Sequence, residues 1–352
     1  MPLDGARKQT MNRCVKLMVS HMLLLPLLAL GQGSSPVLVL KSRIPLTHVQ
    51  GRMDHLGVDV QGQRLFAAAN DNHTLEVIDL KAGRQVRTLA DLDKPQGAFY
   101  DGSTNHLFIA TEGDGGVRIL DGASYQLLKT VTLASDADNI RYDLRSQRVL
   151  VGYGGEKFLK GKVLRGHGDG ALALLDAAGT KMGEIGIDAH PESFQVEKSG
   201  TRVFINVPDR HEVQVADLPT GRVLAHWPIA NCTDNFPMAL DEMHHRLFIG
   251  CRIPATLQVL DTGSGTRVAT LEAAGSDDIF YDAHRGRLYV LGDEGSVIVF
   301  QRKDLDHYDK IASYPTGPGA WTGLWVPEWS KLFVSAPAQG GQSAQILIFE
   351  AN

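Results

Sequence analysis

A short phrase of one basic residue followed by apolar residues returns seven times along the chain, at intervals of 42, 42, 54, 44, 41 and 44 residues. The seven copies are Arg64–Phe66, His106–Phe108, Arg148–Leu150, Arg202–Phe204, Arg246–Phe248, Arg287–Tyr289 and Lys331–Phe333. An apolar run precedes the phrase, and a clean alternation of apolar and polar positions follows it, as in Leu75–Asp79. Alternation is typical of β-strands with one buried face, so each repeat predicts several short strands.

This repeat length is typical of a four-stranded propeller blade, and the sequence therefore predicts an all-β, seven-bladed β-propeller. The last repeat ends soon after a third strand at Ile346–Phe349, so its outer strand is missing. We expect an N-terminal strand at about residues 37–44 to supply it and to close the ring, which removes free sheet edges. Because no linker or composition shift separates the repeats, residues 32–352 are interpreted as a single propeller domain.

Six of the seven repeats carry an acidic residue six positions before the apolar residue of the phrase. These acids are Asp59, Asp101, Asp143, Glu197, Asp241 and Asp282. The seventh repeat has Val326 instead. An acid that opens a tight turn can accept hydrogen bonds from the backbone two residues on, so we expect a structural role for these acids.

The first 31 residues differ from the rest of the chain. Lys8, Arg13 and Lys16 precede an apolar run at 17–30, and Ala29-Leu30-Gly31 offers small residues for cleavage. This pattern predicts a signal peptide at residues 1–31 and an exported, periplasmic or secreted protein. A membrane anchor is the alternative, but a span needs about 20 apolar residues. The run is shorter, so we expect no membrane span after the signal is removed.

Charge and cysteines narrow the expected partners and compartment. The net charge is −5, and it becomes −8 without residues 1–31, which hold four basic residues and one acid. Nucleic-acid binding depends on basic patches, so no nucleic-acid partner is expected. Export leaves Cys232 and Cys251, which propeller topology places on the same face, in a leading segment and in a loop after a second strand. A disulfide bond and two unpaired buried thiols are both compatible with this spacing.

The residues just before each inner strand are expected to surround the mouth of the central channel. They are polar, with two histidines and several acids among them. The candidate ligand-binding residues are Asp54, His55, Gln96, Asp138, Asn139, His190, Glu192, Asp234, Asn235, Asp277, Asp278, Trp321 and Thr322. Carboxylates and imidazoles together suit a divalent metal, with His55, His190 and Glu192 as its candidate ligands. The alternative is that these side chains bind water and cap strand ends.

Two further features remain open. An insertion with Lys157, Lys160, Lys162, Arg165 and His167 lengthens the third repeat and is expected to form a loop over the mouth. The pair His244-His245 falls in a turn on the opposite face, where solvated histidines are expected.

We interpret the chain as an exported, monomeric, non-catalytic binding propeller whose mouth holds a small molecule, a cation or a partner protein or peptide. No catalytic residue is assigned, and a divalent metal is the cofactor that the residues allow. The alternative is a metal-assisted hydrolase or oxidoreductase that uses the same mouth.

The repeat also resembles a known family. Its inner strand, acidic turn, basic-apolar-aromatic strand and apolar-x-Val-apolar-Asp strand resemble the YVTN-type, YncE-like propellers of exported bacterial proteins, over about residues 37–352. The phrases His190–Phe194, Asn235–Asp241 and 318–322 resemble a subgroup with no assigned activity, in which arginine is usual at the position of Trp321. Propeller subunits of quinone-dependent amine dehydrogenases resemble the same repeat. Their redox centre lies elsewhere, so no catalytic residue transfers from them.

Overall fold

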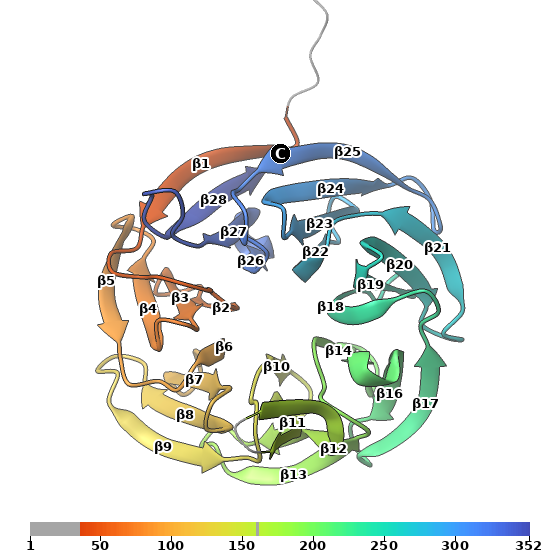
Figure 1. The fold of residues 1–352 in the computed structure, drawn as a ribbon, viewed down its shortest axis with the longest axis horizontal. Helices are drawn as coiled ribbons and strands as arrows, with labels where there is room; N and C mark the ends of the chain where they lie inside the picture. Colours follow the sequence, from red (N-terminus) through yellow and green to blue (C-terminus); the bar gives the residue numbers. More distant parts are fainter. Residues whose placement is uncertain (1–35, 160–161) are drawn as a thin grey trace, which may run out of the picture. The chain divides into compact units, whose positions relative to one another are not determined.

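The computed structural model describes residues 36–159 and 162–352, and the side chains of these residues except 156–167. The predicted signal peptide at residues 1–31 lies outside the described residues. The described chain forms seven four-stranded antiparallel sheets, with only two short 3₁₀ helices besides, Pro208–Arg210 and Pro327–Trp329. The sheets stand in a ring (Figure 1). The predicted all-β, seven-bladed β-propeller is therefore confirmed.

Each blade is described from its inner to its outer strand. Blades 1 and 2 are β2 (Leu56–Asp59), β3 (Arg64–Ala69), β4 (Thr74–Asp79), β5 (Arg84–Leu89) and β6 (Pro95–Asp101), β7 (His106–Thr111), β8 (Gly116–Asp121), β9 (Leu127–Thr132). Blades 3 and 4 are β10 (Ile140–Asp143), β11 (Arg148–Leu159), β12 (Lys162–Leu175), β13 (Lys181–Ile187) and β14 (Phe194–Val196), β15 (Arg202–Val207), β16 (Glu212–Asp217), β17 (Arg222–Pro228). Blades 5 and 6 are β18 (Thr233–Asp241), β19 (Arg246–Ile253), β20 (Thr256–Asp261), β21 (Arg267–Glu272) and β22 (Ser276–Asp282), β23 (Arg287–Gly292), β24 (Ser296–Arg302), β25 (Tyr308–Pro315).

The seventh blade combines the two ends of the described chain. Its inner strands are β26 (Gly323–Val326), β27 (Lys331–Ala336) and β28 (Gln345–Ala351), and its outer strand is β1 (Leu38–Pro45). β1 pairs antiparallel with β28, from Leu38 opposite Ala351 to Pro45 opposite Gln345. β1 lies beside β28 in Figure 1. The predicted closure is confirmed, with the strand one residue later than expected.

The core lies between the blades. Seven clusters of buried apolar residues each join two neighbouring blades, so that every interface in the ring has its own cluster. The third residue of the repeated phrase is buried in each blade, at Phe66, Phe108, Leu150, Phe204, Phe248, Tyr289 and Phe333. The repeated phrase is therefore the part of the sequence that packs one blade against the next.

The acids of the repeat have the predicted structural role. Asp101, for example, accepts hydrogen bonds from the backbone N–H and the hydroxyl of Ser103 and from the hydroxyl of Thr104. All six acids are buried. In several blades the acid also pairs with an arginine, as Asp59 does with Arg64 at 2.8 Å. These carboxylates fix the turn between the inner strand and the next.

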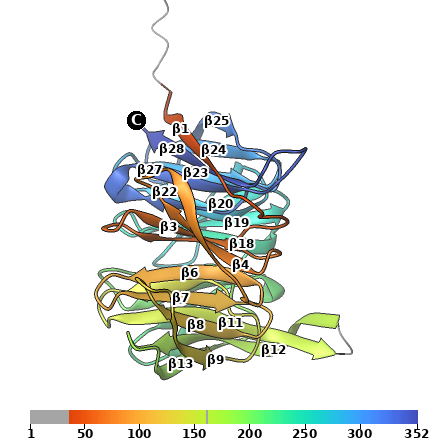
Figure 2. The ribbon, with the colours of Figure 1, turned by 90° about the vertical axis from the view of Figure 1, so that its left-hand side faces the viewer.

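The insertion in the third repeat is not the expected loop. β11 and β12 continue through it as paired strands, from Glu156 opposite Arg165 to Leu159 opposite Lys162. The resulting hairpin extends beyond the neighbouring blades (Figure 2). The backbone pairing of the two strands resumes after an irregularity at Gly154. The side chains of the insertion lie outside those described.

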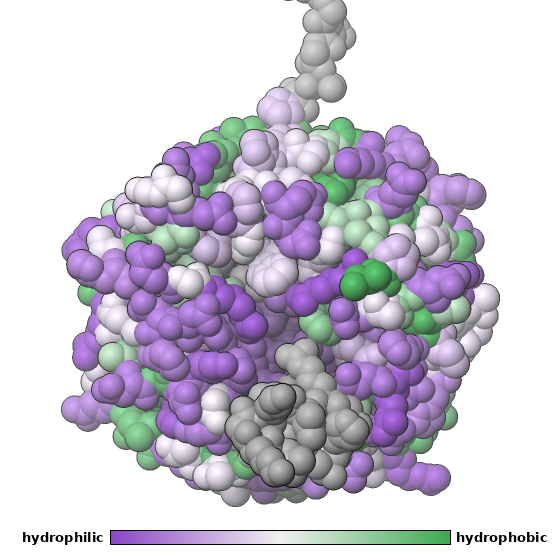
Figure 3. Space-filling view, viewed as in Figure 1, coloured by the Kyte–Doolittle hydropathy of each residue, from purple (hydrophilic) through white to green (hydrophobic). Residues whose placement is uncertain are grey.

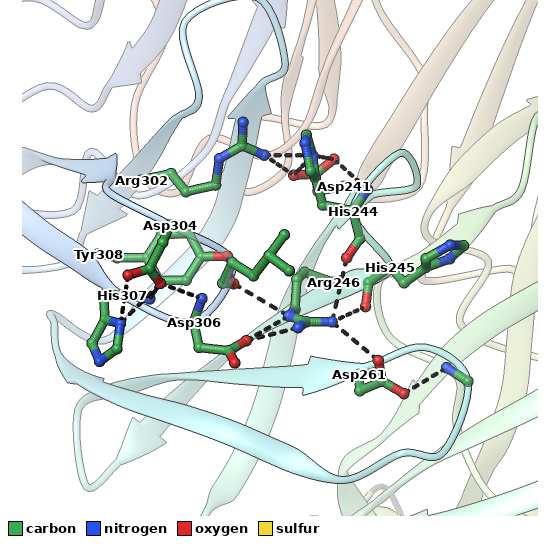
Figure 4. Close-up of polar contacts among 12 residues, drawn as sticks. Asp241, His244, His245, Arg246, Asp261, Arg302, Asp304, Asp306, His307 and Tyr308 are labelled. Atoms are coloured by element: carbon green, nitrogen blue, oxygen red, sulfur yellow. Dashed lines mark hydrogen bonds and ion pairs between the residues drawn. The ribbon is translucent and has the colours of Figure 1, made fainter.

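One expectation about the opposite face is also corrected. His245 is exposed, but His244 is half-buried, with its Nδ1 2.9 Å from Asp241 and close to Arg302. Figure 4 shows this group beside a second one, in which Arg246 binds Asp306 and Asp261. The His244 side chain is partly buried because it lies against the charged pair of Asp241 and Arg302. Both groups join blade 5 to blade 6.

The search for membrane-spanning helices gave no candidate within the part of the chain that the structure describes.

Candidate functional site

The mouth of the channel is a small polar cavity of about 120 Å³. Side chains from all seven blades form its wall, which is a consequence of the ring. The wall consists of Arg52, Asp54, His55, Gln96, Glu112, Asp136, Asp138, His190, Glu192, Phe236, Arg252, Asp277 and Trp321. Figure 3 shows hydrophilic residues around the hollow at the centre of the ring. Residues more than 200 positions apart in the sequence thus share one cavity.

The structure brings together eight of the thirteen candidate residues in this wall. They are Asp54, His55, Gln96, Asp138, His190, Glu192, Asp277 and Trp321. Asn139 and Asp278 do not line this cavity, but both contact His55, which does.

The remaining three candidates do not line the cavity either. Asn235 is fully buried, and its Nδ2 donates to the carbonyl oxygen of Glu212. Thr322 is buried, with its hydroxyl near the carbonyl oxygen of Met53. Asp234 is half-buried outside the wall.

Irregular strand pairing sets which side chains face the mouth. The pairing of β6 with β7 is interrupted at Gln96, and that of β22 with β23 at Asp277 and Asp278. In β18 the interruption falls after Asn235 and includes Phe236. An extra residue re-aims neighbouring side chains, which explains why Phe236 lines the mouth whereas Asn235 is turned away.

Arg52 connects blades 1 and 2. Its guanidinium pairs with Asp54 and donates to Oε1 of Gln96 at 2.7 Å. The pKa of Arg52 is raised, chiefly by the carboxylate of Asp54. Burial raises the pKa of Asp54, and this effect exceeds the lowering by Arg52. Arg52 therefore stays charged in the wall, beside a carboxyl group that is costly to keep ionised.

Arg252 is one of two residues that blade 5 contributes to the cavity wall, together with Phe236. Its Nη2 lies 2.6 Å from Oδ1 of Asp277 in the next blade. Its guanidinium carbon lies 4.0 Å from the ring centre of Phe236 and 4.8 Å from that of Trp321. Such cation–π contacts hold a guanidinium in place. Burial raises the pKa of Asp277, although Arg252 opposes this.

His55 is held from both sides. Its Nδ1 lies 3.1 Å from Asp278, and its Nε2 lies 3.3 Å from Nδ2 of Asn139 and 3.7 Å from Oδ1 of Asp138. Burial by itself would lower the pKa of His55, but Asp278, Asp54 and Asp138 together raise it well above the ordinary value. The surrounding carboxylates therefore favour the charged form of the half-buried His55.

A second histidine lies with two acids at the seam between blades 3 and 4. Asp138, His190 and Glu192 each offer a ligand atom, and these atoms lie within 4.8 Å of one another. His55, which the sequence suggested as a ligand, is not in this group, and Asp138 takes its place. Burial would lower the pKa of His190, but Asp136, Glu192 and Asp138 raise it to about 9.

Cys232 and Cys251 are joined in a disulfide bond, with their Cα atoms 5.4 Å apart. Cys251 lies within β19, opposite Asn235, and not in the loop that the sequence suggested. β19 is longer than expected because its pairing with β20 continues to Thr256. The bond fixes the segment that leads into β18 to the strand that carries Arg252.

Four charged wall residues were missed by the sequence analysis: Arg52, Glu112, Asp136 and Arg252. Glu112 directly follows β7, and Arg252 lies near the end of β19. In each blade the second strand ends on the face of the ring where the inner strand begins, because the two strands are antiparallel. Charged residues at those ends were therefore a usable signal for two of the four.

Below the mouth, the channel holds a cavity of about 360 Å³ with a largely apolar wall. Arg141 lies in this wall, where its Nη1 donates to the carbonyl oxygen of Ile140 at 2.9 Å. Burial lowers the pKa of Arg141. His55 lines both this cavity and the mouth.

Comparisons with known proteins support the fold. No protein-family model matches the chain, and neither does any curated protein. A chain in a crystal structure of the mitotic checkpoint complex is similar, with a TM-score of 0.71 and 13% sequence identity. The match covers 94% of this chain and 98% of that chain. At this identity the likeness shows the propeller fold alone, a scaffold that unrelated functions share.

Proposed function

We propose that this chain is an exported, non-catalytic binding propeller whose mouth holds a small ligand with positive charge. The observation that carries the proposal is the composition of the cavity wall. Six carboxyl groups, two arginines and two histidines from different blades face one space of about 120 Å³, so acidic groups outnumber basic ones. A cavity of this size suits a cation or a small amine, whereas a peptide would contact it with a single side chain.

The electrostatics of the wall support a cationic ligand. Asp138 contributes to raising the pKa of Asp54, and Asp54 contributes to raising that of Asp277, because carboxylates repel one another. A raised pKa means that the charged form is destabilised. A bound cation would relieve this repulsion, so the ionised wall favours a positively charged ligand.

Export is supported by two features of the chain. The apolar segment before the propeller has the pattern of a signal peptide. A disulfide bond between Cys232 and Cys251 is typical of proteins in oxidising compartments. The resemblance to YVTN-type propellers points to the same location.

A metal-assisted hydrolase or oxidoreductase is the second candidate. The observation that favours it is the group formed by Asp138, His190 and Glu192. Turnover of a chromogenic phosphate or carboxylic ester by wild type, lost in Glu192→Gln, would favour this candidate over binding alone.

The binding proposal is tested by a thermal-shift screen with small amines, amino acids and divalent cations. A ligand that binds only the folded ring raises its melting temperature. We expect positively charged compounds to do so in wild type and to lose most of this effect in Asp277→Asn. The matched control is Asp309→Asn, which removes an exposed carboxylate from the outer strand β25. Stabilisation by anions only, or an equal loss in both variants, would contradict the proposal.

A further inference from the structure

At the seam between blades 3 and 4, an imidazole and two carboxyl groups are close enough together to share one ligand. Asp138 precedes β10, whereas His190 and Glu192 precede β14. Their ligand atoms lie within 4.8 Å of one another. Asp138 and His190 are buried, and Glu192 is half-buried. A ligand at this point would be bound by two blades.

His190 is oriented with one ring nitrogen toward this group. Its Nδ1 lies 2.7 Å from the carbonyl oxygen of Gly154, to which it donates. Its Nε2 is directed to the acids, 3.7 Å from Oδ2 of Asp136. Histidines that bind metals commonly donate their other ring N–H to a carbonyl or carboxylate, which fixes the ring.

The backbone around Gly154 is built for this contact. Gly155 has a φ of +76°, and a Cβ at this position would come within 2.0 Å of the backbone nitrogen of His190. Only glycine allows such an approach at a positive φ. The close packing places the carbonyl oxygen of Gly154 against the imidazole.

Asp138 supplies an independent observation. Its side chain is 6% exposed, and Oδ2 accepts a hydrogen bond from Nδ2 of Asn139. Its other oxygen, Oδ1, is buried and has no hydrogen-bond partner among the described residues, although Nε2 of His55 lies 3.7 Å from it. A buried carboxylate oxygen without a partner is costly, so it commonly has a ligand.

From this geometry we infer that Asp138, His190 and Glu192 bind one divalent transition metal of the zinc class. One imidazole nitrogen and two carboxylate oxygens form a ligand set that suits Zn²⁺ and Co²⁺, and three protein ligands leave a position for water or a small anion. The inference rests on the proposed function, because it names the cation that the acidic mouth binds.

The test uses the chain produced from its full sequence, purified without an affinity tag and dialysed against a chelator. Zn²⁺ binding is measured by calorimetry, and Co²⁺ binding by its visible absorption. We expect one metal per chain. The dissociation constant should rise by at least about tenfold in His190→Gln and in Asp138→Asn.

The matched control is a substitution of His226, in the outer strand β17 of blade 4. Asp188, Glu212 and His226 form a second group that could hold a metal, and two of the three are exposed. His226→Gln removes its imidazole without touching the mouth. We expect this variant to bind Zn²⁺ as wild type does. Glu192→Gln is a further mouth variant in case His190→Gln does not fold, as judged by circular dichroism.

The outcomes separate the inference from the proposed function. Loss of binding in the mouth variants, with His226→Gln unchanged, supports the metal site. Loss in His226→Gln alone, or no binding by wild type, overturns it. If wild type binds no metal but a small amine still stabilises it in an Asp277-dependent way, the proposed function stands without the metal site. If neither binds, both fail.

Discussion

Arg252 combines two interactions at the mouth, an ion pair with Asp277 and contacts with the rings of Phe236 and Trp321. These groups come from blades 5, 6 and 7. Trp321 of blade 7 supplies a flat face to a guanidinium from blade 5, on the far side of blade 6.

We expect Arg252→Ala to lower the free energy of unfolding by about 2 kcal/mol, because Asp277 loses its counter-charge in a largely buried place. Urea unfolding measures the loss, and Trp321 fluorescence reports the local change. The double variant Arg252→Ala/Asp277→Asn should recover part of the stability. If the two substitutions are simply additive, the ion pair does not contribute as described.

For single residues, the sequence predicted a polar mouth more accurately than it predicted which side chains form the mouth. Residues at fixed distances before the turn acids gave most of the wall, because the repeat determines where inner strands begin. Phe236 follows the same rule and lines the mouth, whereas Asn235, one position further upstream, is turned away by the irregular pairing in β18. That irregularity depends on contacts between strands, which a single repeat does not record.

The elements depend on their turn acids as well as on their apolar faces. In blade 2, Asp101 accepts three hydrogen bonds from Ser103 and Thr104, at 2.7 to 2.9 Å. Burial would raise the pKa of Asp101, but these hydrogen bonds outweigh it, so the pKa is lowered. The ionised carboxylate therefore stabilises the folded turn.

Asp101→Asn should lower the free energy of unfolding by about 1–2 kcal/mol at neutral pH. Since the folded pKa of Asp101 lies below its unfolded value of about 3.9, the stabilisation is present above that value. It is lost as the pH falls through the folded pKa. Urea midpoints of wild type and variant should therefore converge as the pH falls below the folded pKa of Asp101. A gap that stays constant across this range would show that the charge of Asp101 is irrelevant.

Strands were predicted well where apolar residues alternate, and less well at their ends. The insertion after Gly154 was expected to be a loop because it lengthens one repeat and lies between glycines. The structure pairs its backbone instead, and backbone pairing leaves little trace in side-chain polarity. The same reason explains why β19 was expected to end before Cys251.

For the whole molecule, stability depends on how the ring closes. β1 is the outer strand of the blade whose other strands come from the end of the described chain. Ile44 of this strand is 2% exposed and packs in the cluster between blades 7 and 1. Lys41, in the same strand, is exposed, and its Nζ lies 3.5 Å from Glu350.

We expect Ile44→Ala to lower the free energy of unfolding by about 3 kcal/mol, because it leaves a cavity at the closing blade. Lys41→Ala should change it by less than about 0.5 kcal/mol, since exposed ion pairs contribute little. Both values come from urea unfolding followed by circular dichroism. Similar small effects of both substitutions would mean that the β1 pairing is not a main support of the ring.

The disulfide bond has a consequence for how the protein is handled. Cys251 immediately precedes Arg252, so the cross-link anchors the strand that presents this guanidinium to the mouth. Material produced in a reducing cytosol would lack that anchor. The oxidation state of the sample is therefore an experimental variable, and thiol quantification belongs beside every affinity measured on this propeller.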